Sequence, residues 1–393
     1  MASFRKRGAT WTYRIRVKNK QSGEWKEESK GGFRTKKEAQ LAAAEAKLLI
    51  ENSNFKGNGS ETIITYFPRW FDTYKRPNLS PSTVDLQERI IRLHILPRWG
   101  NYKLNEIEYN EYYEWLVELS EIFTLGTLRR INSIFNSAMG AAVHRFKILR
   151  ENPLIRMELP GSKIERKKVV EFFTVEQMER FLEESKRKVK GSKYKLSTEH
   201  FTMFYLLFNT GMRIGECLAL EVNDVDLENH RLSITKTVYY PTTGDTNTPI
   251  VGPTKNRSRR EIEIDEESVE VIREYLENRL LVYDSYPNLP RNEVLLFHNT
   301  LGKHWRANVV RDFFKEVCSR AGVPVLSPHA TRHSHAVHML EAGIDIKSIA
   351  DRLGHDTTKT TTDYYLHITK KTEQNALSLL KKHINSTKEK NKK

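Results

Sequence analysis

The first fifty residues change from an alternating to a helical pattern of apolar side chains. In WTYRIRV, residues 11–17, the Trp, Tyr, Ile and Val share one face, and the Thr and both Arg share the other. A period of two indicates a half-buried strand with a basic outer face. NKQSGEW predicts a turn and a second strand, GGF predicts another turn, and Thr35–Glu38 is a capping box that begins an alanine-rich helix to about Ile50.

The middle of the chain has a helical pattern. Residues 51–62, ENSNFKGNGSET, are polar and rich in Gly, Asn and Ser, which is typical of a linker. From Ile63 to about Glu158 the apolar residues follow helical spacing, with turns at RPNLSPST, PRWGNYKL and FTLGT. Several amphipathic helices of this length form a compact domain. We expect its large aromatic residues in the core rather than as platforms for stacked bases: Trp70, Tyr74, Trp99, Tyr112 and Trp115.

The third region mixes helices and strands. It follows a second hinge, LPGSKIERKK, and begins with a helix capped by Thr174. An apolar segment, residues 201–226, predicts one helix ending near Gly211 and another beginning near Arg213. Strand-like runs at 230–240 and 259–264 come next, joined by a polar loop that ends in GPTKNRS, and after EVLLFH the chain is helical to its basic end.

These patterns predict a multidomain α+β protein. Residues 1–55 form a small three-stranded sheet plus a helix, residues 60–160 an all-helical domain, and residues 168–393 a mainly helical domain with a small antiparallel sheet. At 393 residues and 38% hydrophobic content, the chain is long enough for two or three cores.

Charge changes this picture by pointing to a polyanionic partner. The chain has 65 Lys and Arg against 50 Asp and Glu, a net charge of +15 spread over its whole length. Such a distribution suits DNA contacted by several domains, with salt-dependent affinity, although a ribosomal or membrane-surface protein would also be basic. In the N-terminal sheet, Arg14, Arg16 and Lys18 are the candidate DNA contacts, and a merely solvated basic face is the alternative.

Cysteine usage and the termini favour a soluble protein of a reducing compartment, the cytoplasm. Cys217 and Cys318 lie in apolar helical patterns and are expected to be buried free thiols. The N-terminus lacks the apolar region of a signal peptide, and no apolar run is long enough for a membrane span. We expect no cofactor, because no zinc spacing and no Walker-type loop occur.

Four pieces of the third region carry candidate chemistry. They are Arg213 in NTGMRIGE, Lys255 in GPTKNRSRRE, His329 with Arg332 in SPHATRHSHA, and His355 in LGHD. Each has a plain structural explanation when taken alone. Arg213 can pair with Glu216, the basic run around Lys255 is by default solvated, and His355 can end a helix, where a cation favours the dipole. The histidines at 333, 335 and 338 compete with His329.

The order of these pieces resembles the tyrosine recombinases, the phage integrase family. TGMRIGE, TKNRSRRE ahead of a strand, SPHATRHSHA, LGH and a terminal T-T-x-x-x-Y-x-H follow the family's order, and the N-terminal pattern is similar to its arm-type DNA-binding module. The resemblance spans the chain as a three-part layout and is specific in the third region. It implies that a tyrosine attacks a DNA phosphodiester to give a 3′-phosphotyrosine and a free 5′-hydroxyl.

That reaction sets clear demands on side chains. A tyrosine with a pKa near 10 is about one part in a thousand ionised at neutral pH, so forming the phenolate costs roughly 4 kcal/mol. Without a metal, two guanidiniums can neutralise the phosphoryl oxygens, and Arg213 and Arg332 are the predicted clamp. His329 is three residues before Arg332, so the two share a helix face.

The resemblance assigns the remaining roles. It links His329 to proton transfer at the nucleophile, makes Lys255 the general acid for the 5′ oxygen, and has His355 bind and position the phosphate. Lys236, within the first strand run, is the competing lysine. Glu216 is expected to support Arg213 from the same helix, with a plain surface carboxylate as the alternative.

Two adjacent tyrosines, Tyr364 and Tyr365, compete as nucleophile. Both spacings from His355 occur in sequences resembling this one. Tyr365 fits T-T-x-x-x-Y-x-H with His367, whereas Tyr364 has Leu366 where that histidine should be. We therefore predict Tyr365 as the nucleophile and Tyr364 as a packing neighbour.

The resemblance implies a site-specific integrase of a phage or an integrative or conjugative element in a bacterial host, acting at the nucleoid. Its expected partners are double-stranded DNA at core and arm attachment sites, three further copies in a homotetramer, an excisionase and a host DNA-bending protein. Residues 372–384 have helical apolar spacing and would either reach a neighbouring protomer or pack on their own domain. The alternatives are a DNA-binding regulator or architectural protein, and a chromosome-dimer-type resolvase with the same chemistry.

Overall fold

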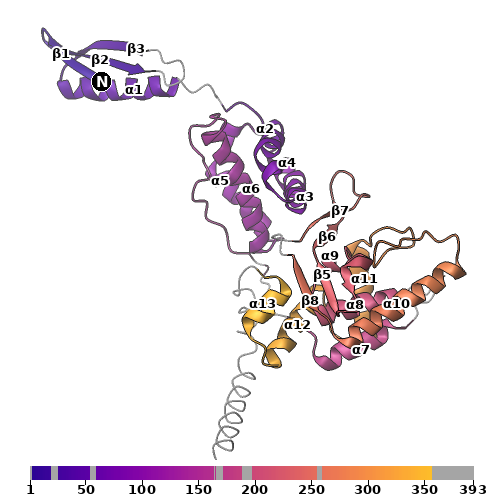
Figure 1. Ribbon diagram of the computed structural model, residues 1–393. Helices are drawn as coiled ribbons and strands as arrows, with labels where there is room; N and C mark the ends of the chain where they lie inside the picture. Colours follow the sequence, from indigo (N-terminus) through magenta and orange to yellow (C-terminus); the bar gives the residue numbers. More distant parts are fainter. Residues whose placement is uncertain are drawn as a thin grey trace, which may run out of the picture. The chain divides into compact units, whose positions relative to one another are not determined.

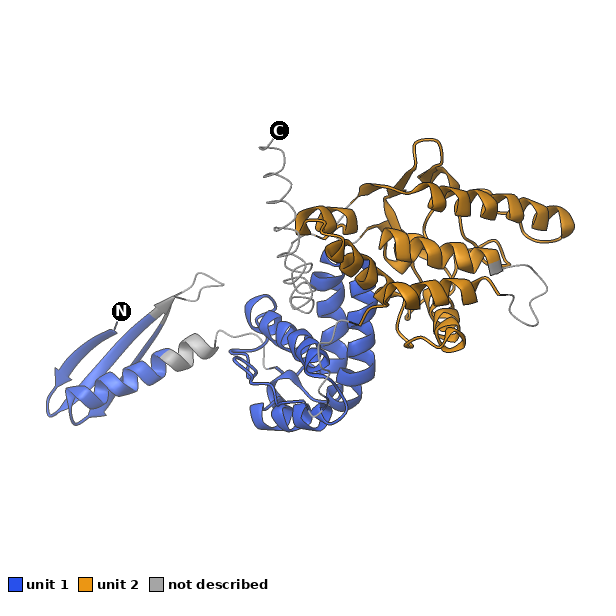
Figure 2. Cartoon of the chain, turned by 90° about the horizontal axis from the view of Figure 1, so that it is seen from below, with its two compact units in different colours: residues 1–166 blue, residues 167–393 orange. Residues whose placement is uncertain are grey.

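The computed structural model describes residues 2–18, 25–53, 59–162, 164, 171–187, 197–254 and 259–355. The chain divides into two compact units, residues 1–166 and 167–393 (Figures 1 and 2). The predicted division into three domains at 1–55, 60–160 and 168–393 stays a prediction. Lys255, Tyr364, Tyr365, residues 372–384 and the side chain of Lys18 lie outside the described part.

The N-terminal part is the predicted three-stranded sheet with one helix. Strands β1 (Ala2–Arg7), β2 (Thr10–Lys18) and β3 (Trp25–Phe33) are antiparallel in the order β1-β2-β3. Tyr13 and Ile15 of β2 are buried with Ala43 and Ala46 of α1 (Lys36–Ser53), which runs along the sheet in Figure 1. The alternating pattern therefore identified the buried face.

Two features of this sheet differ from the prediction. GGF is not a turn, because β3 continues through Gly31 and Gly32 to Phe33, with a bulge opposite Trp11 and Thr12. A Cβ on Gly31 would lie 2.7 Å from Thr12 Oγ1, so glycine permits a close approach of strands here. Strand β1 is almost wholly exposed and carries no apolar alternation that would reveal it.

The basic face of β2 has an acidic neighbour. Arg14 Nε donates to Glu27 Oε2 at 3.1 Å, and Arg16 Nε lies 3.5 Å from Glu27 Oε1. The Arg14 and Arg16 side chains remain 65% and 57% exposed, so both can exchange this weak surface pairing for another anion. Their contact with DNA stays a prediction.

The rest of the first unit is helical, as expected. Its elements are α2 (Ile63–Trp70), η1 (Phe71–Lys75), η2 (Arg76–Asn78), α3 (Pro81–Ile90), η3 (Ile91–Ile95), α4 (Leu96–Trp99), η4 (Leu104–Glu106), α5 (Tyr109–Ser120) and α6 (Leu125–His144). Trp70, Trp99, Tyr112 and Trp115 are buried in one core, and Tyr74 packs against it. The prediction that these aromatic residues form a core is confirmed.

The second unit surrounds its core with helices and carries two small antiparallel sheets. Its helices are α7 (Val175–Ser185), α8 (Ser197–Thr210), α9 (Ile214–Cys217), η5 (Val222–Asp224), α10 (Glu266–Ser285), α11 (Ala307–Ala321), α12 (His329–Glu341) and α13 (Ile346–Leu353). Its strands are β4 (Val225–Asp226), β5 (Arg231–Ile234), β6 (Lys236–Tyr239), β7 (Ile250–Pro253) and β8 (Arg260–Glu263). The sheet order is β4-β5-β8, and β6 and β7 form a separate hairpin.

The strand-like run at 230–240 is two strands rather than one. Its buried residues Leu232, Ile234 and Val238 keep one parity across the break, so the pattern does not reveal it. The hydrogen-bonding partner changes instead: β5 pairs with β4 and β8, and β6 pairs with β7.

Other expectations for this unit are confirmed. The side chains of Thr174 and Gln177 cap the start of α7 reciprocally, and Cys217 and Cys318 are buried free thiols. The multidomain α+β class also holds. Among the helices that the structure describes, none is long and apolar enough to cross a membrane.

Candidate active site

A glycine turn between α8 and α9 begins the candidate site. Gly211 has φ +63°, and a Cβ there would lie 2.5 Å from Leu353 Cδ2 and 2.9 Å from His335 Cδ2. Backbone conformation and space both require glycine. This glycine lets the end of α8 approach α12 and α13, and it places Arg213 at the N-cap of α9.

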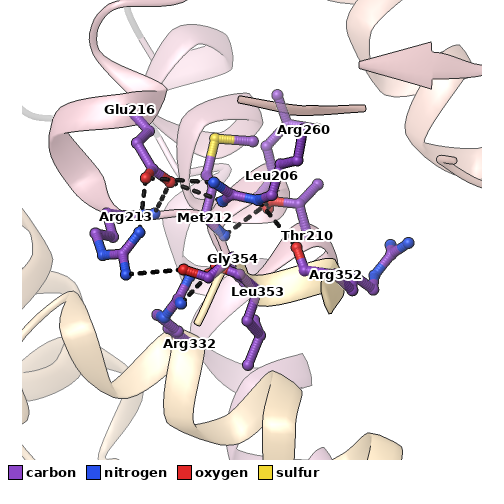
Figure 3. Close-up of polar contacts among 11 residues, drawn as sticks. Leu206, Thr210, Met212, Arg213, Glu216, Arg260, Arg332, Arg352, Leu353 and Gly354 are labelled. Carbon is purple, nitrogen blue, oxygen red and sulfur yellow. Dashed lines mark hydrogen bonds and ion pairs between the residues drawn. The ribbon is translucent and has the colours of Figure 1, made fainter. Parts of the chain in front are cut away.

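Arg213 and Glu216 form the pair that their spacing suggests, but Glu216 is fully buried. Arg213 Nη1 donates to Glu216 Oε1 at 2.8 Å, and the Arg213 backbone N–H donates to Oε2 at 2.9 Å. The Glu216 side chain is 0% exposed and that of Arg213 is 26% exposed. The plain surface carboxylate is thus wrong for Glu216. Arg213 Nη2 also lies 3.5 Å from the carbonyl oxygen of Gly354, next to His355 (Figure 3).

Arg332 is held by backbone at the C-terminal ends of two helices. Its Nη1 donates to the Gly211 carbonyl at 2.8 Å, and its Nη2 donates to the Leu353 carbonyl at 2.6 Å. The residue is only 1% exposed, and a buried guanidinium needs such partners. These two bonds fix the plane of the guanidinium.

His355 follows the glycine that ends α13. Gly354 has φ +65°, and the His355 backbone N–H donates to the Ala350 carbonyl at 2.9 Å, which closes the helix end. The pKa of His355 falls from 6.5 to about 4. Burial is the largest cause, followed by the positive charges of Arg332, Arg213, Arg260 and His329.

The lowered pKa has two consequences for the site. The His355 ring is neutral near pH 7, so the explanation that it is a cation favoured by the helix dipole is wrong. The charges that lower the His355 pKa also include those of the other predicted catalytic residues that the structure describes, Arg213, His329 and Arg332. The fold therefore brings these three around one imidazole.

His329 is the exposed first residue of α12, and its ring lies edge-on to that of His333, with centroids 4.6 Å apart. Two competing histidines have structural partners instead. His335 Nδ1 lies 3.0 Å from the Phe208 carbonyl oxygen, and His338 Nε2 lies 3.0 Å from that of Phe173. His335 and His338 thus tie α12 to neighbouring backbone.

Lys236, the competing lysine, is occupied by two carboxylates. Its Nζ lies 2.6 Å from Glu221 Oε1 and 3.3 Å from Asp224 Oδ2. The Lys236 ammonium group is thus engaged in two ion pairs within its own unit. Within the described ranges, no group of three or more His, Cys, Asp and Glu is placed to hold a metal ion.

Sequence reasoning missed Arg260, which belongs to the basic run that was expected to be solvated. Its side chain is 7% exposed, and its Nη2 donates to Glu216 Oε2 at 2.8 Å. One signal was available: Arg260 has the same parity as two buried residues, Ile262 in its strand and Ile264 directly after it. That parity places Arg260 on the inner face.

Three segments of the chain match models of known families. Residues 171–372 match the phage integrase family, residues 62–120 match the N-terminal SAM-like domain of phage integrases, and residues 3–50 match an arm DNA-binding domain. The chain belongs to the phage integrase family. This assignment confirms the expected class of enzyme, a tyrosine recombinase.

Curated relatives and solved structures agree with this family. A XerC-like tyrosine recombinase of Caldanaerobacter subterraneus is 26% identical over 70% of this integrase-family chain and 71% of its own length. Tyrosine recombinase XerC of Halalkalibacterium halodurans is 30% identical over 58% of this chain and 66%, just under two thirds, of its own length.

The fold is similar to that of solved integrases. The Tn1549 transposon integrase in complex with a circular intermediate DNA has a TM-score of 0.65 at 20% identity, covering 81% of this chain and 99% of that one. A lambda integrase tetramer bound to a Holliday junction gives a TM-score of 0.57 at 14% identity, covering 92% of this chain and 94% of that one.

Proposed function

We propose that this chain is a site-specific DNA recombinase that integrates and excises a mobile element. Tyr365 is the nucleophile, Arg213 and Arg332 bind the scissile phosphate, and His329, Lys255 and His355 complete the site. One observation carries the proposal: Arg213 and Arg332 both bond to the backbone at the C-terminal end of α13, where His355 follows.

The charges of this site suit a phosphodiester. Burial, followed by the charges of three arginines and His329, lowers the pKa of His355, whereas a bound anion would raise it again. The neutral imidazole can donate one N–H to a phosphate oxygen without adding charge. The two guanidiniums neutralise the charge that develops on the phosphoryl oxygens, in a setting where water is partly excluded.

The proposed reaction conserves the phosphodiester bond energy. The Tyr365 oxygen attacks phosphorus as its proton passes to His329, the bond from phosphorus to the 5′ oxygen breaks, and Lys255 protonates that oxygen. A 5′-hydroxyl from another strand reverses these steps and reseals the DNA. Glu216 holds Arg213 in place throughout.

The proposed partners follow from the exchange reaction and from related proteins. Exchange of four DNA strands uses four tyrosines, so we infer a homotetramer on double-stranded DNA, the same number of subunits as in the lambda integrase tetramer bound to a Holliday junction. The segment matching an arm DNA-binding domain would hold arm sites through Arg14, Arg16 and Lys18, and residues 60–160 with 168–393 would bind core sites. An excisionase and a host DNA-bending protein would set direction at the nucleoid of a bacterial host.

A half-site DNA with a nick next to the scissile phosphate tests the proposal, because loss of the short leaving strand traps the covalent product. Wild type and Tyr364→Phe should form a denaturant-resistant protein–DNA adduct, and Tyr365→Phe should form none. Wild type that binds the half-site without an adduct would support the alternative, a DNA-binding regulator. Resolution of chromosome-dimer sites in preference to attachment sites would support the other alternative, a resolvase with the same chemistry.

A further inference from the structure

Arg260 joins two parts of the candidate active site that are distant in sequence. Its Nη2 and Nη1 lie 2.8 and 3.4 Å from the two carboxylate oxygens of Glu216, which in turn binds Arg213. Its Nε donates at 3.0 Å to the carbonyl of Arg352, two residues before Gly354. One planar group thus touches the support of Arg213 and the end of α13 (Figure 3).

A second tie reinforces the link between β8 and α13. Arg352 Nη1 donates at 3.0 Å to the carbonyl of Glu263, and Arg352 Nε donates at 3.1 Å to His335 Nε2. The strand that carries Arg260 and the turn that carries His355 are therefore bound together in both directions. A displacement of the Arg260 side chain would therefore be transmitted to both the strand and the turn.

We propose that Arg260 is a positioning residue for strand cleavage, which sets the orientation of Arg213 through Glu216 and the placement of His355 through the Arg352 carbonyl. This inference rests on the proposed function. Arg260 bonds to supporting groups rather than to the reacting ones, so its loss should slow cleavage of bound DNA and leave DNA affinity nearly unchanged.

Only a guanidinium can make both contacts. Its fork spans the carboxylate while Nε points along a third direction. A lysine at this position keeps the charge but meets either Glu216 or the Arg352 carbonyl, not both. A glutamine removes the charge, and among the described residues Glu216 then keeps its ion pair with Arg213 but loses the one with Arg260.

The test compares Arg260→Gln, Arg260→Lys and Arg259→Gln in the full chain. Arg259 is the exposed neighbour and serves as the matched control for loss of one positive charge. Single-turnover cleavage of the nicked half-site is measured at saturating protein, at a temperature where circular dichroism shows every variant folded. A misplaced phosphate-binding group can slow a reaction on the order of 10²-fold. We expect the cleavage rate to fall by that factor in Arg260→Gln, to recover in part in Arg260→Lys, and to equal that of wild type in Arg259→Gln.

A second readout tests whether Arg260 acts on His355 in the folded protein. The imidazole of His355 is followed by NMR against pH in the DNA-free protein, where removal of the Arg260 charge should shift its titration to higher pH in Arg260→Gln but not in Arg259→Gln. Equal cleavage rates in Arg260→Gln and Arg259→Gln would overturn the proposal, as would an unmoved His355 titration. A wild type without covalent adduct would refute the proposed function, and the His355 titration would then decide the role of Arg260.

Discussion

Glu216→Gln removes the single carboxylate that binds both Arg213 and Arg260. The substitution keeps the size and one acceptor oxygen, but it replaces the other oxygen with an amide NH₂ that faces N–H donors. The Glu216 side chain is 0% exposed and that of Arg260 is 7% exposed, so water cannot replace the lost charge. Two guanidiniums then remain near each other without their shared counter-charge.

The size of the effect follows from burial. Removing one partner of a buried ion pair costs about 3–5 kcal/mol. Because glutamine keeps one acceptor and Arg213 is 26% exposed, we expect the lower end, a loss of about 3 kcal/mol in the free energy of unfolding. For a unit of this size, residues 167–393, that loss lowers Tm by about 6–12 °C.

The effect depends on pH in a defined direction. Burial raises the pKa of Glu216, but the hydrogen bond and charge of Arg260, with the backbone N–H and charge of Arg213, lower it below 4.5 overall. A carboxylate with a depressed pKa in the folded state stabilises the protein above its unfolded pKa, and this stabilisation is lost as pH falls through the folded value. The difference in the free energy of unfolding between wild type and Glu216→Gln should be at its full size at pH 7 and should shrink below about pH 4.5.

Calorimetry of the full chain, following the transition of the second unit, measures this difference. Glu261→Gln is the control, because Glu261 is 65% exposed and lies 3.8 Å from Arg231 at the surface. It should change stability by under about 1 kcal/mol. A Glu216→Gln protein as stable as Glu261→Gln at pH 7 would refute the stabilising role of the buried pair.

Three further results are expected. Gly211→Ala should lower the free energy of unfolding in urea by about 1–3 kcal/mol more than Gly343→Ala. Both glycines have positive φ, but only a Cβ on residue 211 would meet neighbouring atoms within 4 Å. Equal losses in the two variants would show that the close contacts at Gly211 do not matter for stability. Arg213→Lys should lower single-turnover cleavage on the order of 10²- to 10³-fold, since lysine lacks the fork; a near wild-type rate would exclude Arg213 from the clamp. Wild type should lose stability as pH falls from 6.5 to about 4, because the His355 ring must release a proton when the chain folds in this range. His355→Gln should lose less stability over the same range. An unchanged dependence of the free energy of unfolding on pH would show that His355 is not buried as a neutral ring.

Sequence reasoning selected residues that the structure brings together, because the expected chemistry restricts residue type. Arg213, His329, Arg332 and His355 stand in short motifs, and the structure gathers them around one helix end. The catalytic roles of these four residues stay predictions, as do those of Lys255 and Tyr365, which lie outside the described residues.

The errors of the sequence-based predictions have physical causes. Charge runs are usually solvated, and this default concealed Arg260, whose inward direction is visible only through the buried Ile262 on the same face. Glycine usually marks turns, but Gly31 instead permits close approach to Thr12 within a continuous strand pair. The Gly31 case depends on a neighbour distant in sequence, which no local pattern contains, whereas the direction of Arg260 could have been read from the parity of its strand.

Identification of the amino acid that carries the DNA is the most direct test of the central claim. Wild-type protein is reacted with the nicked half-site, the adduct is digested with trypsin and nuclease, and the peptide that retains a nucleotide is sequenced by mass spectrometry. The nucleotide should be linked through phosphate to Tyr365. A link to Tyr364 would reverse the choice between the two tyrosines, and a link to any residue other than a tyrosine, or no linked peptide at all, would contradict the proposed mechanism.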